Sequence, residues 1–137
     1  MTDSKKILFV CVENAARSQI AEGFFRKYAT KEYTPISAGI RPTPEINPLV
    51  IQVMKEVGID ISKQTPKELS EEIIRNAYLK INMGCMDKQE CPAVFLGNYE
   101  DWGIEDPKGK PIEKVREIRN SIESRVKELV TNLEYNQ

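Results

Sequence analysis

The chain contains no histidine, and this absence excludes several kinds of catalytic site. Without an imidazole there can be no Ser-His or Cys-His dyad, and most catalytic zinc sites are excluded as well. Any acid–base step must therefore use carboxylates or thiols.

The chain also lacks an excess of charge of either sign. Its 137 residues include 20 Lys and Arg against 21 Asp and Glu, so there is no basic field of the kind that nucleic acid or an anionic membrane requires. No apolar run is long enough for a transmembrane helix, and residues 1–6 carry no signal-peptide core. We expect one cytoplasmic, monomeric domain over residues 1–137, with no nucleic-acid or membrane partner.

Cysteine is scarce and odd in number, with Cys11, Cys85 and Cys91 only. An odd count in a reducing compartment argues against a structural disulfide framework. No fourth thiolate or histidine exists to complete a metal site within the chain, so we expect no bound metal.

Strand-like and helix-like segments alternate along the chain. This order predicts an α/β fold in three layers, a four-stranded parallel sheet with helices on both faces. Asn47-Pro48 and the capping-box pair Thr65 and Glu68 are typical of helix starts. The expected strands are 5–10, 33–37, 78–83 and 93–96, and the expected helices are 18–29, 47–58, 65–76 and 112 to the end.

The most informative segment follows the first predicted strand. Cys11 and Arg17 are separated by five residues at the point where the strand should become a helix, and Ser18 follows. A loop in this place turns backbone N–H groups and a helix N-terminus toward an anion. The same field favours a thiolate, so we expect Cys11 to titrate below the ordinary cysteine pKa of about 8.5 and to act as a nucleophile. Arg17 can bind two oxygens at once, and the expected anion-binding loop comprises Val12, Glu13, Asn14, Ala15, Ala16 and Arg17.

Cys85 and Cys91 follow the third predicted strand, at the same carboxyl edge of the sheet as Cys11. They are interpretable as two ordinary reduced cysteines or as half of a metal site. A third interpretation, which we favour, is thiol–disulfide exchange with a sulfur adduct, which requires all three thiols to lie close together.

Asp106 precedes Pro107 and follows the aromatic residue Trp102. In a chain without histidine, a carboxylic acid held over the anion site is the natural proton donor to a leaving oxygen. The alternative is an ordinary turn residue, since Asp-Pro is common in turns.

Several segments together resemble the thioredoxin-coupled arsenate reductases, which share their fold with low-molecular-weight protein tyrosine phosphatases. These segments are Cys11 to Glu22, Ser37-Ala38-Gly39, Asn47-Pro48, the two later cysteines, and Trp102 to Lys110. The resemblance runs nearly from end to end.

The resemblance implies a mechanism. Cys11 would attack arsenate bound by the loop and Arg17, with Asp106 protonating the departing oxygen. Cys85 would then attack Cys11 and release arsenite, and Cys91 would move the disulfide to Cys85–Cys91 for reduction by thioredoxin or a similar partner. No flavin or nicotinamide would bind.

The chain departs from the family pattern at three places. Glu13 stands where the family has glycine, Ala15 and Ala16 replace a more polar pair, and Lys67 stands where some relatives have an aspartate of a potassium site. We expect a Lys67 ammonium to replace that cation beside the positions of Asn14, Glu22 and Ser37, so that activity is independent of potassium.

Two other functions stay open on the sequence. A phosphomonoesterase acting on phosphotyrosine would need only Cys11, Arg17, Ser18 and Asp106. A non-catalytic anion-binding domain would keep the fold without a reactive Cys11.

Overall fold

A computed structural model of the chain describes residues 4–84 and 92–135. Four strands form one parallel sheet in the order β2-β1-β3-β4, with β1 at its centre. The strands are β1 (Lys5–Cys11), β2 (Tyr33–Gly39), β3 (Ala77–Asn82) and β4 (Tyr99–Asp101). The helices are α1 (Arg17–Tyr28), α2 (Pro48–Lys55), α3 (Glu71–Arg75) and α4 (Ile112–Tyr135), with a 3-10 turn at Pro92–Phe95. The predicted fold class is confirmed.

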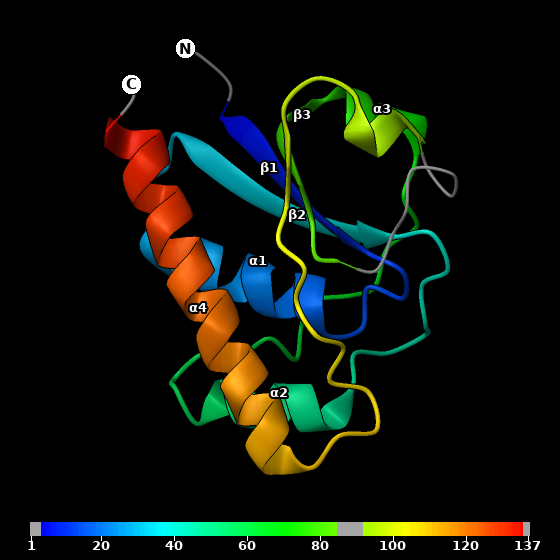
Figure 1. The fold of residues 1–137 in the computed structure, drawn as a ribbon, viewed down its shortest axis with the longest axis vertical. Coiled ribbons are helices and arrows are strands. Elements are labelled where there is room, and N and C mark those ends of the chain that lie inside the picture. The colour runs from blue at the N-terminus through cyan, green and yellow to red at the C-terminus, as the bar shows by residue number, and fades with distance from the viewer. Residues whose placement is uncertain (1–3, 85–91, 136–137) are drawn as a thin grey trace.

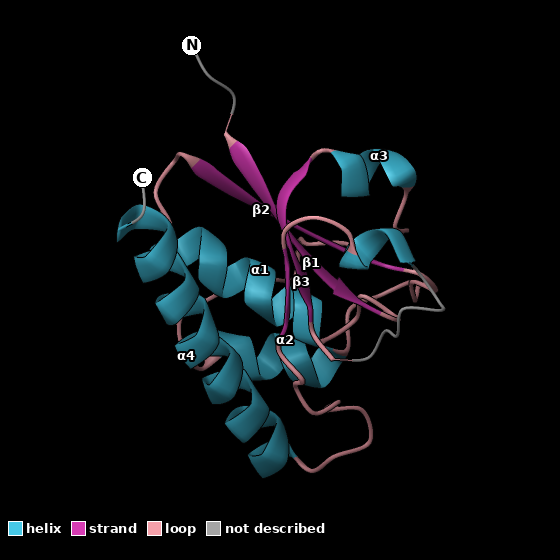
Figure 2. Cartoon of the chain, turned by 45° about the horizontal axis from the view of Figure 1, so that its top comes forward, coloured by secondary structure: helices cyan, strands magenta, loops and turns pink. Residues whose placement is uncertain are grey.

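Helices pack against both faces of the central strand β1. Ile7, Phe9 and Cys11 join the larger core cluster under α1, α2 and α4, whereas Leu8 and Val10 join a smaller cluster under α3 and the 3-10 turn. This alternation follows from the period of two along a strand, and because both faces are covered, residues 7–11 are buried without interruption. Figures 1 and 2 show α1, α2 and α4 gathered on one side of the sheet and α3 on the other.

The helix starts at residues 47–48 and 70 are set by capping side chains. Asn47 accepts a hydrogen bond from the Leu49 amide at 3.0 Å, and Pro48 fills the first helical position of α2 as predicted. The expected start at Thr65 is wrong, because the cap of α3 is Ser70, whose hydroxyl accepts from the Ile73 amide at 3.1 Å. Residue 68 instead forms an isolated parallel bridge with Gly39.

The prediction of a fourth strand at 93–96 is also wrong. Residues 92–95 form a 3-10 turn whose Val94 is fully buried in the smaller core cluster, and the fourth strand is the exposed segment Tyr99–Asp101. A short apolar run satisfies the burial requirement of either a strand or a helical turn, so periodicity could not distinguish them.

None of the described helices combines the length and the apolar character that crossing a membrane requires.

Candidate active site

The predicted anion-binding loop lies at the carboxyl end of β1. Cys11 is the last residue of β1 and Arg17 the first residue of α1, so residues 12–16 connect the central strand directly to a helix N-terminus. Cys11 is buried, and its Sγ lies 2.9 Å from the Ser18 hydroxyl. The strand and the helix thus fix both ends of the loop, and the positive end of the helix dipole points at the thiol.

All five peptide carbonyls of residues 12–16 accept hydrogen bonds from groups outside the concave side of the loop. Four of the donors are backbone amides and one is a side-chain amide: Arg41 N to Val12 O, Thr43 N to Glu13 O, Gln19 Nε2 to Asn14 O, Asn47 N to Ala15 O and Ile20 N to Ala16 O. The C=O and N–H of a trans peptide point in opposite directions, so this arrangement turns the amides of the loop toward its concave side. Such a concave set of amides is suited to a tetrahedral oxyanion.

Asn14 is the buried residue that organises the loop from behind. It has a φ of 53°, the one left-handed non-glycine residue in the described part of the chain, and asparagine tolerates that conformation. Its Oδ1 accepts from the Lys67 amide at 2.8 Å, and its Nδ2 donates to the Ser18 hydroxyl at 2.6 Å. Because Ser18 accepts from Asn14, its own hydrogen can be donated to the Cys11 sulfur, an arrangement that stabilises a thiolate.

Arg17 connects the loop to the segment that carries Asp106. Its Nη1 donates to the Ile104 carbonyl at 2.7 Å, and its Nη2 lies 3.8 Å from Asp106 Oδ2. The Arg17 side chain is buried, whereas that of Asp106 is exposed at the mouth of the cleft, where its Oδ1 accepts from the Lys108 amide at 3.0 Å. The structure therefore brings Cys11, Arg17, Ser18 and Asp106 together as the sequence predicted.

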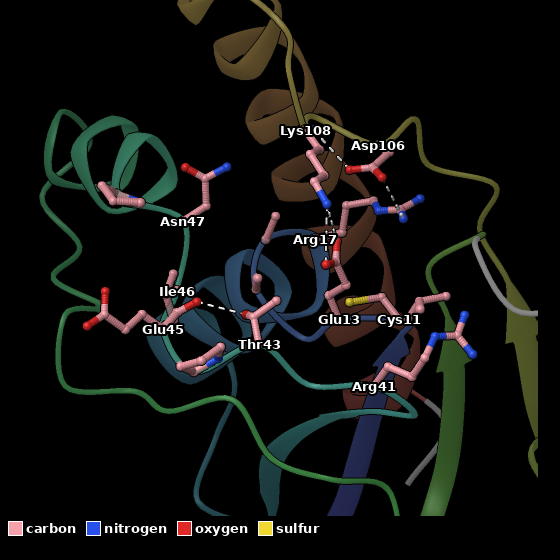
Figure 3. A pocket seen from close by; sticks show the side chains of 15 residues that line it. Cys11, Glu13, Arg17, Arg41, Thr43, Glu45, Ile46, Asn47, Asp106 and Lys108 are labelled. Carbon is pink, nitrogen blue, oxygen red and sulfur yellow. Dashed lines mark hydrogen bonds and ion pairs between the residues drawn. The ribbon is translucent and has the colours of Figure 1, made fainter.

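Cys11, Arg17 and Asp106 line a cleft of about 950 Å³ (Figure 3). Its opposite wall comes from the connection between β2 and α2, with Arg41, Thr43, Glu45 and Ile46 among the lining residues. No chemical motif in the sequence marks this wall, so it was not predicted. Its Arg41 and Thr43 hold the loop through backbone amides, which leave no sequence signal.

Glu13 projects to the mouth of this cleft. Its carboxylate oxygens lie 3.3 and 3.4 Å from Lys108 Nζ, and Glu13 and Lys108 both line the cleft. Figure 3 shows the Glu13 side chain rising from the loop toward Lys108. The extra negative charge of this loop is thus retained at the site and compensated by a neighbouring ammonium.

A second charged group lies behind the loop. Glu22 is buried, and its Oε1 accepts from the Ser37 hydroxyl at 2.7 Å and lies 3.9 Å from Lys67 Nζ. Residues 14, 22, 37 and 67 therefore lie close together, as the resemblance implied. Within residues 4–84 and 92–135, no group of three or more Cys, Asp or Glu side chains is arranged to hold a metal ion.

Cys85 and Cys91 lie outside the described residues, but the chain that leads to Cys85 is well placed. The Met83 amide donates to Val10 O at 3.0 Å, and the Ile104 amide donates to Met83 O at 2.8 Å. Gly84 has a φ of +113°, and a Cβ there would lie 2.8 Å from Gly103 Cα and from the Ile104 amide nitrogen. The chain thus reaches residue 84 beside the segment whose Ile104 carbonyl binds Arg17.

Comparison with known proteins agrees with this geometry. Residues 6–137 match the family profile described as low molecular weight phosphotyrosine protein phosphatase. Arsenate reductase 2 from Staphylococcus saprophyticus is 38% identical over 132 residues, which cover 95% of this chain and 99% of that protein. Arsenate reductase from Staphylococcus aureus strain Newman is 39% identical over 120 residues, covering 86% of this chain and 90% of that protein.

Solved structures give the same grouping. An arsenate reductase in the phosphate binding state superposes with a TM-score of 0.83 at 34% identity, covering 93% of this chain and 98% of the other. An arginine phosphatase from Geobacillus stearothermophilus superposes with a TM-score of 0.86 at 26% identity, covering 97% and 95%. A thioredoxin-dependent arsenate reductase from Corynebacterium glutamicum superposes with a TM-score of 0.84 at 37% identity, covering 99% of this chain and 65% of the other. The chain belongs to the low molecular weight phosphotyrosine protein phosphatase family.

Proposed function

We propose that this chain reduces arsenate to arsenite, with Cys11 as the nucleophile. The observation that carries the proposal is the buried Cys11 thiol at the start of a loop whose carbonyls all face outward, with Arg17 and Asp106 above it. This geometry serves arsenate and phosphate alike. The choice of arsenate is supported by the relatives at 38 and 39% identity, which are named arsenate reductases.

The first step joins sulfur to arsenic. The Cys11 thiolate attacks arsenate held by the loop amides and the Arg17 guanidinium, an arsenic–oxygen bond breaks, and Asp106 donates the proton with which that oxygen leaves as water. Ser18 stabilises the thiolate before attack through its 2.9 Å contact with the sulfur. The loop amides stabilise the charge that develops on the remaining oxygens.

The second step transfers two electrons. Cys85 attacks the Cys11 sulfur, a disulfide forms, and the sulfur–arsenic bond breaks with its electron pair left on arsenic, which departs as arsenite. Cys91 then attacks Cys85, restores the Cys11 thiol and leaves a Cys85–Cys91 disulfide. The position of Gly84 beside Gly103 and Ile104 supports this relay, because the residue next along the chain is Cys85.

The final disulfide needs an external dithiol. We propose a thioredoxin-type reductant, supported by the thioredoxin-dependent relative from Corynebacterium glutamicum. Such a reductant and a relay of free thiols suit the reducing cytoplasm, where we propose that the chain works as a monomer.

The test is multiple-turnover arsenite formation with thioredoxin, thioredoxin reductase and NADPH. We expect Cys85→Ser and Cys91→Ser each to lose at least about a hundredfold in rate, since each removes one obligatory sulfur of the relay. The control is phosphate affinity, which both variants should keep because neither residue belongs to the loop. Unchanged multiple turnover in either variant would contradict the proposal.

A second candidate is phosphomonoester hydrolysis through a Cys11 phosphoenzyme. It is favoured by the family match and by the likeness to an arginine phosphatase. Hydrolysis of an aryl phosphate at a rate indifferent to Cys85→Ser and Cys91→Ser, together with no arsenite formation, would identify it as the main activity.

We also propose that the enzyme needs no potassium or other cofactor. The Lys67 ammonium lies 3.9 Å from the buried Glu22 carboxylate, where it supplies the positive charge that a bound cation would provide. The Lys67 backbone amide at the same time binds Asn14, so this residue supports the loop twice.

A further inference from the structure

The carboxylate of Glu13 is the feature of the cleft that the proposed mechanism does not use. A negative charge in an anion-binding loop weakens binding of any oxyanion unless it makes a compensating contact. Its ion pair with Lys108 compensates part of the charge but leaves the carboxylate at the mouth of the cleft.

The chemistry of oxyanions offers such a contact. Arsenate and phosphate carry at least one hydroxyl at neutral pH, whereas sulfate carries none. A carboxylate can accept a hydrogen bond from the hydroxyl of a protonated oxyanion but meets only lone pairs on sulfate. A group placed to accept that hydrogen bond therefore discriminates against the analogue that cannot donate it.

The structure holds Glu13 in a position to do this. Its backbone belongs to the loop, its carbonyl is held by the Thr43 amide at 3.1 Å, and its carboxylate is held by Lys108. Lys108 in turn binds Asp106 through its backbone amide, so Glu13 and Asp106 are kept on the same side of the cleft (Figure 3). Both carboxyl groups therefore lie at the mouth of the cleft, where they could be reached by the outer oxygens of an anion bound to the loop amides.

We propose that Glu13 is a specificity-determining residue that makes this loop select protonated oxyanions, arsenate and phosphate, over sulfate. This inference rests on the proposed use of the loop as an oxyanion site. It does not depend on the cysteine relay.

The test is isothermal titration calorimetry of the reduced protein with inorganic phosphate and with sulfate at neutral pH. The wild-type chain should bind phosphate at least about tenfold more tightly than sulfate, because only phosphate donates to Glu13. In Glu13→Gln the sulfate affinity should rise about tenfold as the repulsion is removed, while the phosphate affinity changes less than about threefold. The phosphate-to-sulfate ratio then falls toward one.

The matched control is Glu45→Gln. Glu45 is an exposed carboxylate on the opposite wall of the same cleft, so its removal changes the net charge of the cleft equally without altering the loop. The ratio of phosphate to sulfate affinity should stay within about twofold of the wild-type value, since solvent screens the interaction between an exposed Glu45 carboxylate and the bound anion. Lys108→Met should lower the affinity for both anions, and the affinity for sulfate more, because Glu13 then loses its compensating cation.

The inference is overturned if the ratio of phosphate to sulfate affinity is unchanged in Glu13→Gln. It is also overturned if Glu45→Gln lowers this ratio equally, or if Glu13→Gln changes the affinities for both anions by the same factor. Thermal unfolding of each variant shows whether a change arises from loss of the fold. A wild-type chain that binds neither anion would contradict the oxyanion site and the proposed function together. If the wild-type chain forms arsenite but Glu13→Gln leaves the ratio of phosphate to sulfate affinity unchanged, this inference alone is overturned.

Discussion

At the scale of single residues, Glu22 is a buried carboxylate with three polar partners. Its Oε2 accepts from Arg26 at 2.9 Å, its Oε1 accepts from Ser37 at 2.7 Å, and the Lys67 ammonium lies 3.9 Å away. A buried carboxylate requires such partners, because an unpaired charge in the interior is strongly destabilising. Since Lys67 completes this set, its removal should create a place for an external cation.

We therefore expect Lys67→Met to acquire a potassium dependence that the wild-type chain lacks. Its arsenite-forming rate and its melting temperature should both rise in potassium relative to sodium at equal ionic strength. The gain in rate should be roughly twofold, because a partly exposed ion pair contributes up to about 1 kcal/mol. Rates measured in the two salts check this.

Lys31→Met is the control, since Lys31 is an exposed residue on the turn between α1 and β2. It should respond equally to both salts. A wild-type chain whose activity rises clearly in potassium would show that Lys67 does not replace the cation.

The residues of the site divide into two groups by how they could be predicted. Cys11, Arg17 and Asp106 carry side-chain chemistry in a recognisable order, so the sequence alone placed them at one site. Arg41 and Thr43 act on the loop through backbone amides, which every non-proline residue possesses. Their contribution depends on where the β2–α2 connection passes, and that is a property of the folded chain.

At the scale of elements, the end of β2 packs against the anion-binding loop at Gly39. A Cβ there would lie 2.5 Å from Val12 O, 2.8 Å from Cys11 O and 2.9 Å from the Asn14 amide nitrogen. All three are backbone atoms of the loop or of Cys11, which precedes it, so they cannot move aside without changing the shape of the anion site. Glycine is required here by close approach and not by an unusual φ.

We expect Gly39→Ala to weaken phosphate binding by at least about tenfold and to destabilise the fold by about 1–3 kcal/mol, the typical cost of overpacking. Calorimetry with phosphate and urea unfolding measure the two effects.

The matched control is Gly58→Ala. Gly58 has a φ of +80°, but a methyl group on its Cα would meet no atom within 4 Å, so alanine there strains only the backbone. It should cost about 1 kcal/mol of stability and leave phosphate affinity unchanged. Equal losses of phosphate affinity in both variants would show that the contact with the loop is not responsible.

Elements with strong periodicity, or with proline after an N-cap residue, were predictable. Short apolar segments were not, and the capping-box pattern of Thr65 and Glu68 was misleading. The periodicity from residue 112 onward predicted α4, and Asn47-Pro48 predicted α2, because each signal arises within the element itself. The conformation of residues 92–101 depends on the space left beside β3. Val94 packs into the smaller core cluster, and the exposed segment Tyr99–Asp101 pairs with Lys80–Asn82 as the edge strand. Edge pairing of three exposed residues has no sequence pattern to reveal it.

At the scale of the whole molecule, α4 is joined to α2 by a network of charged groups centred on Glu56. Arg116 donates to both Glu56 oxygens at distances from 2.7 to 3.2 Å, and the buried Arg119 donates to Glu56 Oε1 and to Val53 O at 2.8 Å. This network lies on the helical layer, away from the cleft residues, so it should affect stability without affecting anion binding.

The network predicts how stability depends on pH. Hydrogen bonds from Arg116, and secondarily from Arg119, lower the pKa of Glu56 from the ordinary 4.5 to about 2. The unfolded chain therefore takes up this proton at a higher pH than the folded chain does. The stabilisation from Glu56 is complete above about pH 4.5 and is lost as the pH falls from there toward 2.

We expect Glu56→Gln to lower the urea midpoint of unfolding at pH 6, because Arg119 is left buried without its carboxylate. The difference from wild type should shrink progressively between pH 4.5 and the acid limit, as wild-type Glu56 itself becomes protonated. Glu71→Gln is the control, since its pair with Arg75 is exposed at 3.9 Å and should contribute little at any pH. A difference for Glu56→Gln that stays constant down to acid pH would contradict the assignment, because only a carboxylate that titrates below its ordinary pKa in the folded chain makes the difference vanish in that window.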